Sequence, residues 1–143
     1  MHYITALNMF KDNMVFGKGP KLFRYLCSDN RYKPNENLKN EDVCSTHPHN
    51  TYIQLLSETG IIGFSIIFFI FLILCYKFIY LAINNYIFKR YKLDDIRICL
   101  LVSLFIFLFP LIPTGSFFNN WVSILHFMAF GFYLGLKNVS YDK

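Results

Sequence analysis

An uninterrupted apolar run from Ile61 to Ile83 is the feature that most constrains how this chain can fold. The run contains a single charged side chain, Lys77. As an α-helix it is roughly 34 Å long, which is enough to cross a hydrocarbon core of about 30 Å. A helix inside a water-soluble protein is seldom apolar on every side. The run therefore predicts a transmembrane helix, with Lys77 reaching the membrane surface along its aliphatic stem.

Two further apolar runs follow, over residues 98–113 and 117–136. The first is roughly 24 Å long as a helix, which is short for a full crossing. Only Thr114, Gly115 and Ser116 separate the two runs. They form either two tilted short spans or a partly re-entrant hairpin, and we favour two spans. The expected fold is an all-α membrane protein with about three transmembrane helices, over 61–83, 98–113 and 117–136.

Residues 1–59 are polar by comparison and form a separate, partly helical segment. Apolar residues recur at helical spacing over residues 3–13, a further turn or two is expected over 21–26, and residues 50–58 read as a helix. Asn50 is a suitable N-cap for that last helix, and Gly60 marks its end or a bend into the membrane. The chain is thus divided into a loop segment, 1–59, and a transmembrane region, 60–143.

The distribution of charge sets the expected orientation. Of the 14 Lys and Arg residues, 7 follow Gly60, against only 3 of the 9 acidic ones, and most lie between or after the apolar runs. Cytoplasmic loops carry such an excess, so loop 84–97 and tail 137–143 are expected in the cytoplasm and residues 1–59 outside it. The loop around Gly115 carries no charge and is expected outside, so the aromatic residues Phe117, Phe118 and Trp121 are expected at the outer membrane surface. A nucleic-acid-binding protein would cluster its charge on a soluble face, so no nucleic-acid partner is expected.

The densest group of chemically capable residues is the stretch from Cys44 to Asn50, which includes His47 and His49. His49 directly precedes the predicted N-cap, where the positive end of the helix dipole disfavours a charged imidazole. A neutral imidazole is what a general base requires. Two histidines in a loop are by spacing alone more often structural than catalytic. The position of His49, one short helix away from the outer membrane surface, favours the catalytic interpretation.

The spacing His49-Asn50, nine residues, Gly60, two residues, Gly63 resembles the His motif of the O-antigen ligase and O-antigen polymerase superfamily. Upstream, Phe16-Gly17-Lys18-Gly19-Pro20 followed by Phe23-Arg24 is similar to the Gly-x-Gly element in the same outer loop of that family. The resemblance covers nearly the whole chain. No Lys-Ser or Lys-Thr pair follows these glycines, so they do not form a nucleotide-binding P-loop.

The resemblance implies a bacterial inner-membrane glycosyltransferase of lipopolysaccharide biosynthesis, with residues 1–59 periplasmic and the C-terminus cytoplasmic. Such enzymes take a glycan from a polyprenyl-pyrophosphate carrier and transfer it to lipid A–core or to another carrier-linked glycan, without a metal or cofactor. His49 would then activate the acceptor hydroxyl, and Asn50 would cap the helix and steady His49. Arg24 is the main candidate for pyrophosphate binding, because a guanidinium matches phosphate oxygens bidentately. Further substrate-binding candidates are Lys18, Lys21 and His47.

Family members have many more spans, and an arginine that they carry early in the outer loop has no counterpart here. We therefore expect the chain to be the C-terminal part of such an enzyme, inactive without the missing N-terminal half. The alternative is a small non-catalytic membrane protein that binds partners or lipid. It predicts a genuine ribosome-binding site before Met1, whereas the fragment predicts an upstream frame with further apolar spans.

Cys27 and Cys44 both lie in the segment that is expected outside the cytoplasm, where disulfides form. A disulfide between them would hold the intervening loop near His49. A zinc site from Cys27, Cys44, His47 and His49 is the alternative, although the spacing of its Cys-x2-His-x-His end is not a common zinc pattern. The sequence thus favours a disulfide and predicts no metal site.

Overall fold

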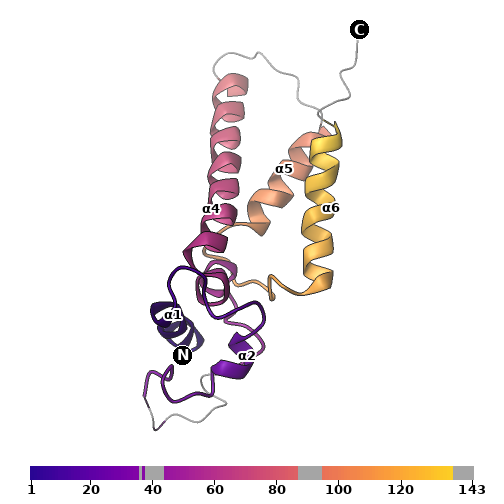
Figure 1. Cartoon of the computed structure of the whole chain (residues 1–143). Helices are drawn as coiled ribbons and strands as arrows, with labels where there is room; N and C mark the ends of the chain where they lie inside the picture. The colour runs from indigo at the N-terminus through magenta and orange to yellow at the C-terminus, as the bar shows by residue number, and fades with distance from the viewer. Residues whose placement is uncertain (36, 38–43, 87–94, 137–143) are drawn as a thin grey trace. The chain divides into compact units, whose positions relative to one another are not determined.

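The computed structural model describes residues 1–35, 37, 44–86 and 95–136. In this part of the chain there are helices and no strand: α1 His2–Asp12, α2 Phe23–Leu26, α4 Thr51–Tyr86, α5 Asp95–Phe107 and α6 Asn120–Leu136 (Figure 1). The predicted all-α class is confirmed for these residues. Most of loop 84–97 and all of tail 137–143 lie outside the described residues, so their cytoplasmic placement stays a prediction.

The helix α4 is the element that meets the length and composition of a membrane span, over Thr51–Ile83. The other two apolar helices, α5 and α6, have 13 and 17 residues and are short for a full membrane crossing. The helix predicted over 98–113 ends at Phe107, because Pro110 and Pro113 lack the N–H of a helix interior and restrict the residue before them. The described residues thus contain one candidate span, and three crossings stay a prediction.

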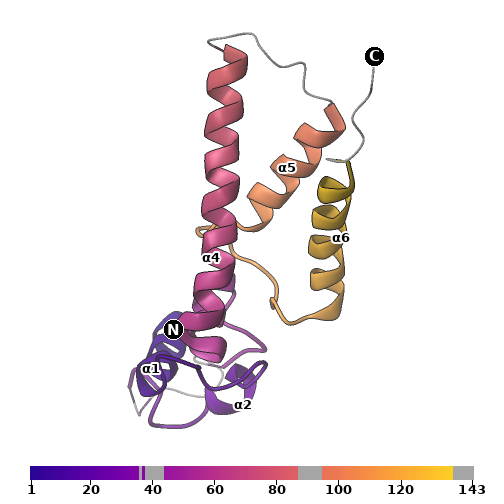
Figure 2. The same ribbon diagram turned by 45° about the horizontal axis from the view of Figure 1, so that its top comes forward.

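The chain divides into two compact units, one formed by residues 1–68 and 110–122 and the other by described residues of 69–109 and 123–143. In both views α1 and α2 lie beside the first turns of α4, within the first unit (Figures 1 and 2). The core of the first unit consists of Ala6, Met9, Phe23, Cys27 and Tyr32. The core of the second consists of Leu74, Leu101 and Leu104. The candidate site residues all belong to the first unit.

The helix α4 is broken at Gly60, where φ is 65° and ψ is −164°. A loop that precedes α2 forms hydrogen bonds at this break. The N–H of Ile61 donates to the carbonyl of Met14 at 2.8 Å, and the N–H of Gly19 donates to the carbonyl of Glu58 at 2.8 Å. Backbone groups freed by the break are thus paired, as buried backbone groups must be.

Two glycines make this close approach possible. A Cβ atom on Gly60 would lie 2.3 Å from the carbonyl oxygen of Val15, and one on Gly17 would lie 2.5 Å from the carbonyl carbon of Glu58. Both glycines also have φ values near +65°, which other residues adopt at a cost. Gly17 belongs to the Gly-x-Gly element and Gly60 to the His motif, so one close backbone contact joins these two sequence elements.

We expect the substitution Gly60→Ala to destabilise the first unit by about 2 kcal/mol or more, because it adds backbone strain to a steric clash. Thermal unfolding in detergent, followed by size-exclusion chromatography, measures the effect. Gly131→Ala is the matched control, since a Cβ there meets nothing within 4 Å. Equal melting temperatures for both variants would contradict the packing described for the kink.

The structure joins Cys27 and Cys44 in a disulfide, with Cα atoms 5.2 Å apart and a sequence separation of 17. A loop of that size corresponds to about 3 kcal/mol of stabilisation. Maleimide labelling of unfolded, unreduced protein should modify only Cys75 and Cys99, which are free, and reduction should expose the other pair. Labelling of all the cysteines before reduction would show that the bond does not form.

Candidate functional site

Asn50 connects the start of α4 to a distant segment of the chain. Its Oδ1 accepts hydrogen bonds from the N–H groups of Tyr52 and Ile53, at 3.0 and 3.1 Å. This is the N-cap geometry that the sequence predicted. Its Nδ2 donates to the carbonyl of Pro110 at 2.7 Å. One carboxamide therefore caps the start of α4 and also binds the connection between α5 and α6 to it.

His47 is held by two hydrogen bonds, one at each ring nitrogen. Nε2 lies 3.1 Å from the carbonyl oxygen of Thr114, and Nδ1 lies 2.9 Å from Oγ1 of Thr46. A carbonyl can only accept, so Nε2 carries the proton and Nδ1 accepts from the threonine hydroxyl. Burial lowers the pKa of His47 and favours this neutral ring. With both nitrogens occupied, His47 is suited to a positioning role.

His49 is exposed and has a φ of 59°, in the left-handed region. Its carbonyl accepts the N–H of Thr114 at 3.1 Å, which holds the strained backbone. Its ring lies 4.4 Å from that of His47 and 5.6 Å from that of His2, centroid to centroid. Within the described part of the chain, its imidazole has ring neighbours and no hydrogen-bond partner. Unlike the ring of His47, this exposed ring can therefore form a hydrogen bond to a bound molecule.

A buried polar network joins three segments behind the site. It consists of Gln54, Glu58 and Ser116, of which the first two have no exposed surface. Gln54 Nε2 donates to Glu58 Oε2 at 3.1 Å and to Ser116 Oγ at 3.0 Å. The Glu58 carboxylate also accepts the N–H groups of Lys21 and Phe23, at 2.9 and 3.0 Å. The network thus connects the loop before α2, the first turns of α4 and the 110–119 connection.

Lys21 has the same unusual backbone as His49, with a φ of 63°. These two are the non-glycine residues with positive φ in the described part of the chain, and both are candidate site residues. Such a conformation costs of order 1–3 kcal/mol and persists where surrounding contacts hold it. At Lys21 the holding contact is the hydrogen bond to Glu58.

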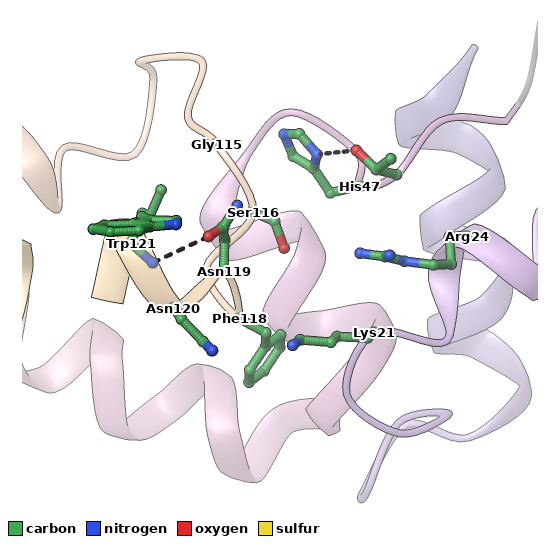
Figure 3. Close-up of a pocket in the computed structure, with 11 residues that line it drawn as sticks. Lys21, Arg24, His47, Gly115, Ser116, Phe118, Asn119, Asn120 and Trp121 are labelled. Carbon is green, nitrogen blue, oxygen red and sulfur yellow. Dashed lines mark hydrogen bonds between the residues drawn. The ribbon is translucent and has the colours of Figure 1, made fainter. Parts of the chain in front are cut away.

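An open cavity of about 510 Å³ lies in front of the polar network. Lys21 and Arg24 line one side of it, and we call this pair the cationic wall. Figure 3 shows both side chains pointing toward residues 115–121, with His47 beside them. Two cations in one cavity can bind an anion with several oxygens, such as a diphosphate.

The structure places the predicted site residues in different surroundings. Lys21, Arg24 and His47 line one cavity. His49 lines a neighbouring cavity of about 440 Å³, which is apolar and includes His2 and Pro48. Lys18 lines neither cavity and instead forms an ion pair with Asp12. The hydrogen bond from Lys18 lowers the pKa of the Asp12 carboxyl. Among the described residues, no group of three or more His, Cys, Asp and Glu side chains is arranged to hold a metal ion.

Sequence reasoning missed the residues of the polar network and the role of the 110–119 connection. A signal for Glu58 existed, because it is a carboxylate two positions before Gly60, next to a long apolar run. Such a group needs hydrogen-bond donors if it is buried. No comparable signal pointed to Thr114 or Ser116, whose partners are more than 60 residues away.

One family of known proteins is similar to part of the chain. Residues 1–69 match a family model described as O-antigen ligase. The matched range contains His49, the Gly-x-Gly element, Gly60 and the Cys27–Cys44 pair. No curated protein and no solved structure matches the chain. Residues 1–69, just under half of the chain, therefore resemble the O-antigen ligase family.

Proposed function

We propose that the chain is part of a membrane glycosyltransferase that ligates or polymerises O-antigen-type surface polysaccharide from a polyprenyl-pyrophosphate carrier. The observation that carries this proposal is the O-antigen ligase match across the His49 motif. It is supported by the cationic wall, whose two side chains share one cavity with His47. The acceptor is lipid A–core or a second carrier-linked glycan, and the site is expected at the periplasmic face of a bacterial inner membrane.

In the proposed reaction, Lys21 and Arg24 bind the pyrophosphate of the donor in one cavity. His49, which lines the neighbouring cavity and contacts the ring of His47, acts as general base toward the acceptor hydroxyl. The acceptor oxygen forms a bond to the anomeric carbon while the bond from that carbon to the pyrophosphate oxygen breaks. The hydroxyl proton passes to a ring nitrogen of His49, and the pyrophosphate leaves with the bonding electrons. The negative charge that develops on this leaving group is stabilised by the cationic wall.

His47 and Asn50 position this base. The ring of His47, fixed at both nitrogens, packs against the ring of His49. Asn50 follows His49 directly and fixes the start of α4 through its cap. Thr114 takes no part in the proposed chemistry, but its N–H donates to the carbonyl of His49. The strained backbone of His49 is therefore held by this hydrogen bond and by the cap that follows it at Asn50.

We expect His49→Asn, introduced into the native gene, to abolish polysaccharide transfer. Asparagine tolerates a positive φ, so this change removes the imidazole without adding backbone strain. Surface polysaccharide is analysed by gel electrophoresis, and the protein is quantified by immunoblot. Transfer that persists at unchanged protein abundance would refute the role of His49 as base.

We expect Arg24→Gln to weaken donor binding about tenfold or more, because it removes a charge-assisted contact to phosphate. Lys11→Gln is the matched control, since Lys11 is an exposed cation of the same unit that lines neither the cationic cavity nor that of His49. Calorimetry with geranyl diphosphate, a short soluble analogue of the carrier, measures the affinity of the purified chain. Equal affinities for the two variants would remove Arg24 from the proposed site.

A further inference from the structure

We propose that Asn119, Asn120 and Trp121 form a glycan wall, which binds the first sugar of the donor beside its pyrophosphate. This inference rests on the proposed function for the choice of a sugar as ligand. These residues line the same cavity as Lys21 and Arg24. They lie outside the range that matches the O-antigen ligase family, which ends at residue 69.

The chemistry of these side chains suits a sugar. Trp121 is 78% exposed, so the face of a large aromatic ring is available for contact. The C–H groups on one face of a pyranose pack well on such a surface, and the indole N–H adds a donor. The carboxamides of Asn119 and Asn120 offer both donors and acceptors, as sugar hydroxyls require. Small-molecule sites are commonly lined by aromatic side chains together with a few polar groups, as this wall is.

The glycan wall is fixed in place, and not merely adjacent to the cavity. Asn119 Oδ1 accepts the N–H of Trp121 at 3.1 Å, and Asn119 N–H donates to the carbonyl of Ser116 at 3.0 Å. Gln54 then holds this segment, through Ser116 Oγ at 3.0 Å and the N–H of Phe117 at 2.9 Å. The same glutamine contacts Glu58, which holds the backbone of the cationic wall. Both walls are therefore positioned by one buried network.

In Figure 3, Lys21 and Arg24 point toward the segment that carries Asn119, Asn120 and Trp121, and all five residues line the same cavity. The volume of about 510 Å³ is in the range of small-molecule sites, about 300–1,000 Å³. A sugar diphosphate has an anionic end and a hydroxyl-rich end joined by one bond. Its two ends thus correspond to the two walls of the cavity.

A different role for Trp121 is that of a membrane-surface anchor, which its position before an apolar helix also suits. The two roles differ in what they require of the ligand. An anchor affects every ligand of the cavity equally, through the stability or depth of the protein in the membrane. A glycan wall affects only ligands that carry a sugar.

The test compares ligands with and without a sugar on the whole chain in detergent. The bare probe is geranyl diphosphate. The sugar probes are the same molecule carrying galactose, N-acetylglucosamine or rhamnose. We expect at least one sugar probe to bind the unmodified chain more tightly than the bare probe. Trp121 is the single tryptophan of the chain, so its intrinsic fluorescence should change with the sugar probe.

In calorimetry, Trp121→Leu should weaken the sugar probe about tenfold, which is typical of a lost ring contact, and leave the bare probe unchanged. Trp121→Tyr should retain most of the affinity because it retains an aromatic face. Tyr25→Leu is the control, since Tyr25 is 69% exposed on the same unit and does not line the cavity. Two results would overturn the glycan wall: equal weakening of both probes by Trp121→Leu, or no sugar probe that binds more tightly than the bare one.

These results are independent of the proposed base. If His49→Asn retains transfer in cells while sugar-dependent binding requires Trp121, the role of His49 fails and the glycan wall stands. If His49→Asn abolishes transfer while Trp121→Leu binds every probe normally, the glycan wall fails and the proposed function stands.

Discussion

The carboxylate of Glu58 is the group on which the rest of the first unit depends. It has no exposed surface, and it accepts hydrogen bonds from the backbone of Lys21 and Phe23 and from Gln54. A buried carboxylate without such donors would be strongly destabilising. These donors come from the segment that carries Arg24 and from the helix that follows His49. Satisfying one buried group therefore brings the cationic wall to the His motif.

The physical meaning of the spacing between His49 and Gly60 follows from what holds each end of the intervening helix. At its start, Asn50 caps the helix and binds the carbonyl of Pro110. At its end, the break at Gly60 receives the loop that contains Gly17. A helix turns by about 100° per residue, so inserting one residue between these ends would rotate one contact away from its partner. Nine residues between Asn50 and Gly60 keep both contacts on their correct sides.

The cavity combines segments that are far apart in the sequence, and each contributes a different chemistry. Lys21 and Arg24 supply positive charge from the loop before and within α2. The stretch before α4 supplies His47, whose ring is fixed by Thr114 from the connection before α6. Trp121, in the first turn of α6, supplies an aromatic ring to the lining of the same cavity. Strain at Lys21 and His49 is concentrated where these segments meet, which is common where a site must hold side chains in fixed directions.

Local features of this protein were predictable because their causes are local. The helix over 2–12, the N-cap at Asn50 and the break at Gly60 follow from apolar spacing, side-chain capping and the freedom of glycine. The pairing of Cys27 with Cys44, which the structure also contains, was favoured by their shared compartment and their separation in a polar loop. The end of α5 at Phe107 was missed, although Pro110 was visible, because apolar composition continued beyond it.

By itself, the sequence determined the helical class of the described residues, the long apolar helix, the capped helix after His49 and the spacing that resembles the O-antigen ligase family. Each of these features depends on residues within one or two dozen positions of one another, so the local sequence pattern is enough to predict it. Only the tertiary structure decided that Lys18 pairs with Asp12 while Arg24 lines the cavity, and that His47 is fixed at both nitrogens while His49 is exposed. It also decided that Trp121 shares the cavity with Arg24. The reason is that the two sides of the cavity are held by hydrogen bonds of Glu58 and Gln54 across 35 to 63 residues, and His47 by one to Thr114 across 67. No local pattern specifies such partners.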